Sequence, residues 1–225
     1  MSDAFGRWNW DGVAGEGGSV VARRDGGELY ELFGALARTT FLEAVIGDLA
    51  PGSVFEVGCG KGQWLQLLKE RGFDATGGDR SAHMVEQARK VDGRVTQFDA
   101  AAIPFPDRSF DNVLTVTVLQ HLADPTRAIA EISRVARSRV IVHEMTRSAV
   151  PSALSPGTRA RSASWFENAF AEHGLRLRPE LTRRTARPKP TNLAGLMPRG
   201  TAGVLWLPRA LGLLAAVHQW LVFER

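Results

Sequence analysis

Cysteine is almost absent from this chain, because Cys59 is the single one among 225 residues. One cysteine cannot form a disulfide within the chain, so the sequence excludes a small secreted fold held together by disulfides. Residues 1–7 also lack the apolar core of a signal peptide, and we therefore expect a cytoplasmic protein. No group of His, Cys, Asp and Glu residues has the spacing of metal ligands, so we expect no metal ion.

Long hydrophobic runs are also missing. The apolar tract at residues 204–223 is interrupted by Pro208, Arg209 and His218. A membrane-spanning helix requires about 20 apolar residues with few charges. We therefore expect no stable membrane insertion, and we interpret the tract as a core helix followed by a terminal strand at residues 217–223.

Acidic residues are slightly fewer than basic ones, with 24 against 28, and the net charge is +4. The basic excess gathers in the last third of the chain, at Arg176, Arg178, Arg183, Arg184, Arg187 and Lys189. Such a group either binds an anionic partner or forms a solvated surface. No aromatic residue is interleaved with these arginines for stacking on bases, so we favour the solvated surface and do not expect nucleic acid as a partner.

The most informative segment is VFEVGCGKGQ, at residues 54–63. Its apolar run leads into glycines at 58, 60 and 62, and a helical apolar pattern follows over residues 62–71. This order predicts a buried strand, a tight turn and a helix. Glycines allow positive φ angles and let the backbone approach a ligand without a Cβ atom. The segment therefore predicts a cradle for a nucleotide cofactor.

Strands and helices alternate along the rest of the chain. We expect helices at residues 28–49, 81–90, 124–136 and 164–173, with strands at 74–78, 95–98, 110–116, 139–144 and 175–182, and a loop or lid at 183–202. A capping box at Ser164–Glu167 is expected to open the helix that ends near residue 173. Alternation of this kind predicts an α/β, Rossmann-like, doubly wound fold whose seven-stranded sheet is mostly parallel, with an antiparallel C-terminal strand.

We expect one domain in three parts. Residues 1–50 would form an N-terminal lid with helices, residues 51–146 the cofactor-binding core, and residues 147–225 a substrate-side lid with the C-terminal strands. Ligands of such sheets bind at the carboxyl ends of the strands. The residues that fall at these ends are Gly58, Asp79, Asp99, Thr115 and Glu144.

Three acidic residues indicate which nucleotide the cradle binds. Asp79 follows the glycine turn by about 20 residues, where a carboxylate accepts hydrogen bonds from ribose hydroxyls. Glu56 stands two residues before Gly58, and its negative charge would repel the pyrophosphate of NAD but attract a cationic ligand. Asp99 ends the third strand, where a carboxylate can accept from an adenine amino group. An NAD-dependent oxidoreductase is therefore disfavoured.

On these residues, positions 36–145 resemble the class I S-adenosylmethionine-dependent methyltransferases. The first motif of that family, D-x-G-C-G-x-G, is matched with Glu56 in place of Asp, and the segment VLQHLADP at 118–125 matches V-L-x-H-L-x-D-P. The resemblance implies S-adenosylmethionine as cofactor and S-adenosylhomocysteine as product. It also implies a set of cofactor contacts: Glu56, Gly58, Cys59, Gly60 and Thr115 near the methionine part, Asp79 at the ribose, and Arg80, Met84, Asp99 and Ala100 at the adenine. The resemblance does not reach residues 1–27 or 147–225.

Methyl transfer asks for alignment of the acceptor and, where the acceptor carries a proton, for one base. The candidate bases are His121, His143 and Glu144. His121 can equally be a residue that caps or packs near the cofactor, and His143 can be a core histidine of a central strand. Glu144, at the end of that strand, is the more pocket-like of the two neighbours.

The function that we expect is transfer of a methyl group to the oxygen, nitrogen or carbon of a small-molecule acceptor in biosynthesis. Two alternatives remain open, an RNA methyltransferase and a regulator that binds S-adenosylmethionine without turnover. The sequence does not identify the acceptor or the oligomeric state.

Overall fold

The computed structural model describes residues 45–146, 159–188 and 215–225. A helix ends at residue 48, and after it the structure contains these strands: β1 Val54–Val57, β2 Ala75–Asp79, β3 Thr96–Gln97, β4 Phe110–Val116, β5 Ala136–Met145, β6 Arg176–Leu177, β7 Arg183–Pro188 and β8 Ala215–Glu224. The helices are α3 Gln63–Glu70, α4 Ala82–Ala88, α5 Thr126–Val135 and α6 Ala163–Ala171, with a short 3₁₀ helix, η1, at Leu119–His121.

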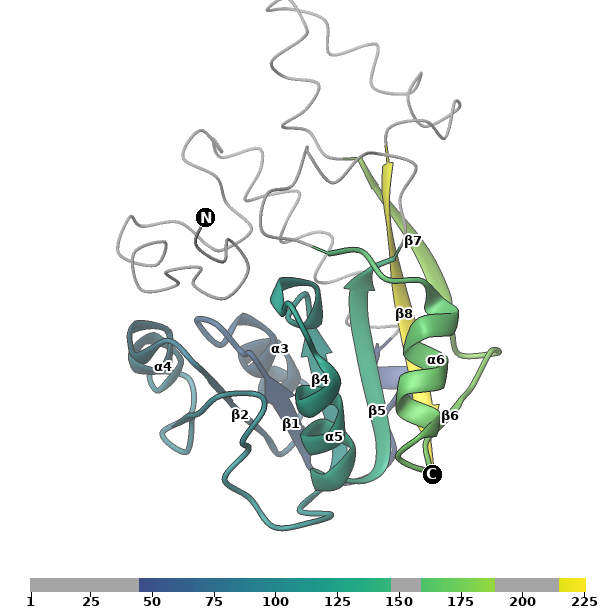
Figure 1. Cartoon of the computed structure of the whole chain (residues 1–225). Coiled ribbons are helices and arrows are strands. Elements are labelled where there is room, and N and C mark those ends of the chain that lie inside the picture. The colour runs from purple at the N-terminus through teal and green to yellow at the C-terminus, as the bar shows by residue number, and fades with distance from the viewer. Residues whose placement is uncertain (1–44, 147–158, 189–214) are drawn as a thin grey trace, which may run out of the picture.

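The sheet follows the order β3-β2-β1-β4-β5-β8-β6, and β7 pairs with β8 beside this path (Figure 1). Neighbouring strands from β3 to β5 are parallel, whereas β8 is antiparallel to β5. The predicted doubly wound sheet with an antiparallel C-terminal strand is therefore confirmed. The chain moves outward from β1 to β3 and then crosses to β4 on the other side of β1. The switch point, where such sheets bind ligands, therefore lies at the carboxyl ends of β1 and β4.

Helices cover both faces of the sheet and bury two apolar clusters. One cluster joins α3 and α4 to the sheet through residues such as Trp64, Leu68 and Val85. The other joins α5 and α6 to the opposite face through residues such as Ile129 and Phe166. Fully burying one such large side chain contributes about 1.5–3 kcal/mol, so these clusters hold the strand ends in fixed positions.

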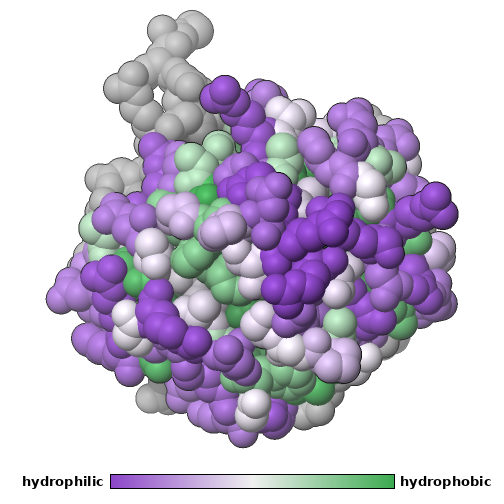
Figure 2. Space-filling model, turned by 90° about the horizontal axis from the view of Figure 1, so that it is seen from below, coloured by the Kyte–Doolittle hydropathy of each residue, from purple (hydrophilic) through white to green (hydrophobic). Residues whose placement is uncertain are grey.

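The edge at which the parallel strands begin is hydrophilic. Figure 2 shows this side as mostly hydrophilic, with small separate apolar areas. An ion pair lies here between Arg137, the second residue of β5, and Asp111, the second residue of β4, at 2.6 Å. Sheets of this kind bind ligands at the opposite edge, where the parallel strands end.

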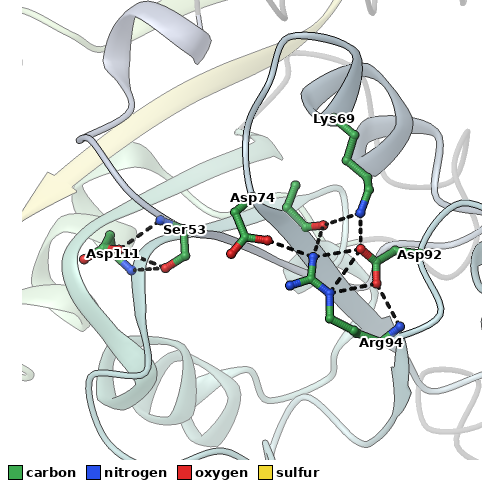
Figure 3. Close-up of polar contacts among 7 residues, drawn as sticks. Ser53, Lys69, Asp74, Asp92, Arg94 and Asp111 are labelled. Carbon is green, nitrogen blue, oxygen red and sulfur yellow. Dashed lines mark hydrogen bonds and ion pairs between the residues drawn. The ribbon is translucent and has the colours of Figure 1, made fainter.

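A buried acid joins α3 to the loop before β3. Figure 3 shows Asp92 between Lys69 of α3 and Arg94, and Arg94 also reaches Asp74 at 2.8 Å. The Asp92 side chain is 3% exposed. Hydrogen bonds from Arg94 lower the pKa of Asp92 far below its ordinary value, more than burial raises it. This cluster therefore connects α3 and the segments that precede β2 and β3.

Several predicted elements are corrected by the structure. Residues 183–188, predicted as part of a loop, form β7, because β8 supplies a pairing partner that lies far away in the sequence. The strand predicted at 175–182 shrinks to β6, since Pro179 follows it and the chain turns with Leu181 N donating to Arg178 O. Helix α6 is capped by Ser162 rather than by Ser164, with Trp165 N donating to Ser162 Oγ.

Other predictions lie outside the described residues. These are the N-terminal lid, the helix before residue 45, the loop at 189–202 and the core helix expected after residue 204. Among the helices that the structure describes, none is long and apolar enough to cross a membrane.

Candidate active site

The glycine turn after β1 follows the predicted course. The φ angles of Gly58, Gly60 and Gly62 are 74°, 53° and 80°, values that glycine adopts without strain. The amides of Gly58 and Cys59 donate to Gly78 O at 2.8 and 3.0 Å, which ties the turn to β2. Within the part of the chain that the structure describes, a Cβ atom on Gly60 would meet nothing within 4 Å. The turn therefore presents bare backbone toward open space, as a cofactor cradle requires.

Asp79 at the end of β2 faces this turn. Its Oδ2 accepts from Gly60 N at 3.0 Å, and its Oδ1 accepts from Ser81 N at 2.9 Å. A carboxylate offers about four acceptor positions, so each oxygen can accept from more than one donor. The predicted site residues Gly58, Gly60 and Asp79 are thus brought together.

Glu56 lies beneath the turn with 1% of its surface exposed. Its Oε2 has no hydrogen-bond partner among the residues that the structure describes. Burial, and then the charge of nearby Asp79, raises the pKa of Glu56 well above its usual value. A cationic ligand group placed at this orphaned oxygen would lower the pKa of Glu56 again, because it favours the ionised carboxylate. The ammonium of a methionine moiety fits this requirement, and a pyrophosphate does not.

Cys59 packs into the apolar cluster with 5% of its surface exposed. Burial raises the pKa of its thiol, and the charges of Glu56 and Asp79 raise it further. The thiol stays protonated, which agrees with the interpretation of Cys59 as a small packing residue rather than a nucleophile.

The predicted adenine contacts divide into two groups. Arg80 and Asp99 lie side by side, 3.9 Å apart, with 63% and 52% of their side chains exposed, and Ala100 beside them is half-buried. Met84 is only 2% exposed, at the start of α4. The exposed pair is open to a ligand, whereas Met84 belongs to the interior below it.

Thr115 is placed deeper than we expected. It is fully buried in the middle of the sheet, paired in register with Val57 of β1 and Val142 of β5. The turn out of β4 begins at Thr117, which has a φ of 57° and whose amide donates to His143 O at 2.7 Å. The residue after it, Val118, lies against Gly58: a Cβ on Gly58 would be 2.3 Å from Val118 Cγ2.

The three candidate bases have different surroundings. His121, at the end of η1, is half-buried, and its Nε2 lies 3.3 Å from Gln120 Nε2. His143 is fully buried and stacks on Trp220 with ring centres 4.3 Å apart. Glu144 is also fully buried, and both its oxygens accept backbone amides of η1. Glu144 is therefore directed into the protein, contrary to our expectation that it is the more pocket-like residue.

Arg161 was not singled out from the sequence. Its guanidinium donates to Leu119 O at 2.9 Å and to Leu122 O at 2.8 Å, so it holds the segment that carries His121. No motif marks Arg161, because it reaches this segment across about 40 residues of chain. Within the described ranges, no group of three His, Cys, Asp or Glu residues could hold a metal ion.

Comparisons with known proteins agree with this geometry. A family model described as a methyltransferase domain matches residues 55–142. The ubiquinone biosynthesis O-methyltransferase of Nitrosomonas europaea is 30% identical over 186 residues, which cover 76% of this chain and 74% of that protein. A probable tRNA methyltransferase 9B of Mus musculus is 33% identical over 91 residues, 40% of this chain but 20% of that protein.

The fold also resembles solved structures. A chain from the complex between the Haloferax volcanii Trm112 methyltransferase activator and the putative methyltransferase superposes with a TM-score of 0.66, covering 97% of both chains. The two sequences are 19% identical, so this likeness concerns the fold alone.

Proposed function

We propose that this chain, which belongs to the family of S-adenosylmethionine-dependent methyltransferases, transfers the methyl group of S-adenosylmethionine to a small-molecule acceptor. The observation that carries the proposal is the orphaned Oε2 of Glu56 beneath a glycine turn that also holds Asp79. A cationic methionine moiety beside a ribose satisfies both acids at once. An ordinary dinucleotide satisfies only one.

Each part of the cofactor has residues to hold it. Asp79 would accept the ribose hydroxyls, since the Gly60 and Ser81 amides already fix its orientation. Asp99 and Arg80, both exposed, would flank the adenine edge. Glu56 would neutralise the ammonium of the methionine part, and the bare backbone at Gly60 would let the ligand approach closely.

The bound cofactor supplies a methyl group that is already activated by its positive sulfur. The protein then has to orient the acceptor in line with this group, which by itself provides a large share of the rate. Where the acceptor carries a proton, His121 is the base that we propose. It is the one candidate of the three with an exposed edge, whereas His143 and Glu144 lie in the interior.

We propose oxygen as the acceptor atom, because a relative that covers 76% of this chain is named an O-methyltransferase of ubiquinone biosynthesis. A phenolic hydroxyl suits a single histidine base, since the phenol loses its proton as the methyl group arrives. A panel of catechols and other phenols, scored by S-adenosylhomocysteine release and product mass, tests this choice. Methylation of carbon or nitrogen acceptors alone would contradict it.

Cofactor identity is tested separately by thermal unfolding. S-adenosylmethionine and S-adenosylhomocysteine should raise the unfolding temperature, because a ligand of the folded state adds RT ln(1 + [L]/Kd) to stability. NAD should not. An equal shift with NAD would refute the cofactor assignment, and binding without release of S-adenosylhomocysteine on any acceptor would favour a regulator.

Transfer RNA is the second candidate acceptor. The Mus musculus relative and the basic isoelectric point near 9.8 favour it, although that match covers 20% of the relative. Bulk unmodified tRNA is therefore added to the same release assay. Methylated nucleosides after digestion, with no turnover of phenols, would replace the small-molecule assignment.

A further inference from the structure

The Glu144 carboxylate is bound by three consecutive backbone amides. Its Oε1 accepts from Val118 N at 2.8 Å and from Leu119 N at 2.7 Å, and its Oε2 accepts from Gln120 N at 3.1 Å. Glu144 is the next-to-last residue of β5, whereas the three amides belong to Val118 and the first two residues of η1, after the neighbouring strand β4. A fully buried carboxylate thus holds the start of a short helix that follows a strained turn at Thr117.

The carbonyl groups of the same segment are held from another direction. Arg161 donates to the oxygens of Leu119, Leu122 and Ala123, at 2.9, 2.8 and 3.2 Å. The Arg159 amide donates to Gln120 O at 2.7 Å. Amides held by an anion and carbonyls held by a cation leave the segment at 117–123 little freedom, although three residues of 3₁₀ helix have almost no stability of their own.

This segment touches the site at two points. At its beginning, Val118 packs so closely on Gly58 that any side chain on Gly58 would clash. At its other end, η1 stops at His121, the proposed base. The position of the segment therefore sets both the wall of the glycine turn and the location of the base.

We propose that Glu144 is a positioning residue that, together with Arg161, fixes the segment 117–123 over the glycine turn. In this assignment Glu144 takes no proton from the acceptor. It acts through Val118 on cofactor binding and through His121 on turnover. The inference rests on the proposed function only where turnover is concerned, because the fixed segment exists in the ligand-free protein.

The ionisation of Glu144 should make the freedom of the segment 117–123 depend on pH. Burial raises the pKa of Glu144 to about 7, even though the three amides and then Arg161 oppose that change. Other titratable or charged groups on the described elements around it are His143 beside it on β5, His121 on η1, Asp124, Arg159 and, on β8, His218, whose backbone pairs with Met145. Protonation turns one carboxylate oxygen into a hydroxyl, which is a donor and a weaker acceptor, so the three amides are held less strongly and the segment should loosen as the pH falls below neutrality.

Amide hydrogen exchange of the ligand-free protein is the direct test. In Glu144→Gln the side-chain NH₂ replaces one acceptor, and amides 118–120 should exchange at least about tenfold faster. The matched control is Glu131→Gln, which removes a carboxylate that accepts Ile103 N at 2.8 Å outside the site. This control should speed exchange near Ile103 and leave amides 118–120 unchanged.

Binding and turnover complete the test. Glu144→Gln should weaken S-adenosylhomocysteine binding several-fold and lower kcat by about tenfold, and Glu131→Gln should change neither. Exchange that stays unchanged at 118–120 overturns the proposal. So does a loss of turnover by about a thousandfold with unchanged exchange and binding, which would make Glu144 the base.

If Glu144→Gln does not fold, the wild-type protein decides. Exchange at amides 118–120, corrected for the intrinsic effect of pH, should become faster relative to exchange at the amides of β5 between pH 8 and pH 6. A constant ratio overturns the proposal. Failure of wild-type protein to bind S-adenosylhomocysteine would instead refute the proposed function and leave the exchange result standing.

Discussion

The Gly60 amide donates to Asp79 Oδ2 at 3.0 Å, so that the glycine turn and the acid of the next strand are a single unit. A second amide, from Ser81, fixes the other oxygen. Asp79, the acid that we propose to bind the ribose, is therefore oriented before any ligand arrives, which reduces the ordering that binding has to impose.

Replacement of this acid should impair the cofactor site. Asp79→Ala is expected to weaken binding of S-adenosylmethionine by about 2–3 kcal/mol, the range for losing charge-assisted hydrogen bonds in a partly buried site. Titration calorimetry measures the change. Asp74→Ala is the control, because Asp74 precedes the same strand at the opposite edge and is 66% exposed. Equal losses in both variants would contradict the ribose assignment.

Two glycines separate the cost of backbone strain from the loss of a ligand contact. Gly60 and Gly72 both have positive φ, 53° and 83°, and a Cβ atom on either would meet no atom of the described residues within 4 Å. Gly60→Ala and Gly72→Ala should therefore each destabilise the fold by about 1 kcal/mol. Of the two substitutions, only Gly60→Ala should also weaken cofactor binding, because Gly60 lies in the proposed cofactor site and Gly72 does not. Unfolding curves and calorimetry on the two variants check this, and equal cofactor affinities would be the contrary result.

The order of strands and helices could be predicted from the sequence because its signals are local. The run of residues 54–63 carries its own strand, turn and helix pattern, and the acids at 79 and 99 each mark a strand end. Parallel strands bring such ends to one edge whatever the details of packing. Gly60 and Asp79 accordingly lie in direct contact through a hydrogen bond, whereas their roles in cofactor binding stay predictions.

What the sequence could not reveal depends on contacts between distant segments. Strand β7 requires β8, and its own basic sequence resembles a loop. The orientation of Glu144 depends on hydrogen bonds from amides about 25 residues earlier. The hydrophobic periodicity of a strand does not predict such contacts. Arg161 is a similar case, because the carbonyl groups that its guanidinium binds come from a segment about 40 residues earlier in the chain.

The Asp92 cluster should be important for stability but not for function. Asp92→Asn removes the carboxylate shared by Lys69 and Arg94, and is expected to lower the free energy of unfolding at pH 7 by about 2 kcal/mol. The folded pKa of Asp92 is depressed, so this contribution is present above the unfolded value of 3.8 and lost as the pH falls further.

Urea unfolding at pH 7 and at successively lower pH measures that contribution. Asp107→Asn serves as the control, because Asp107 pairs with Arg134 but is 75% exposed, and its loss should stay within about 0.5 kcal/mol. Cofactor affinity should be unchanged in both variants. A stability difference between wild type and Asp92→Asn that does not shrink on acidification would argue against the ion cluster.

Glu56 links stability, pH and cofactor binding in one residue. Its folded pKa is raised by burial, so the stability that it contributes is full below the unfolded value of 4.5 and is lost as the pH rises through the folded value. Glu56→Gln should therefore make the ligand-free protein more stable at pH 7 and 8, because no buried charge has to form.

The cationic methionine part of the cofactor should lower the pKa of Glu56, since it favours the ionised acid. Wild-type protein should thus bind S-adenosylmethionine more tightly as the pH rises and release protons on binding, which calorimetry in buffers of different ionisation enthalpy detects. In Glu56→Gln the proton release should vanish and affinity should fall by about tenfold or more. Proton release that persists in this variant would mean that another group meets the ammonium.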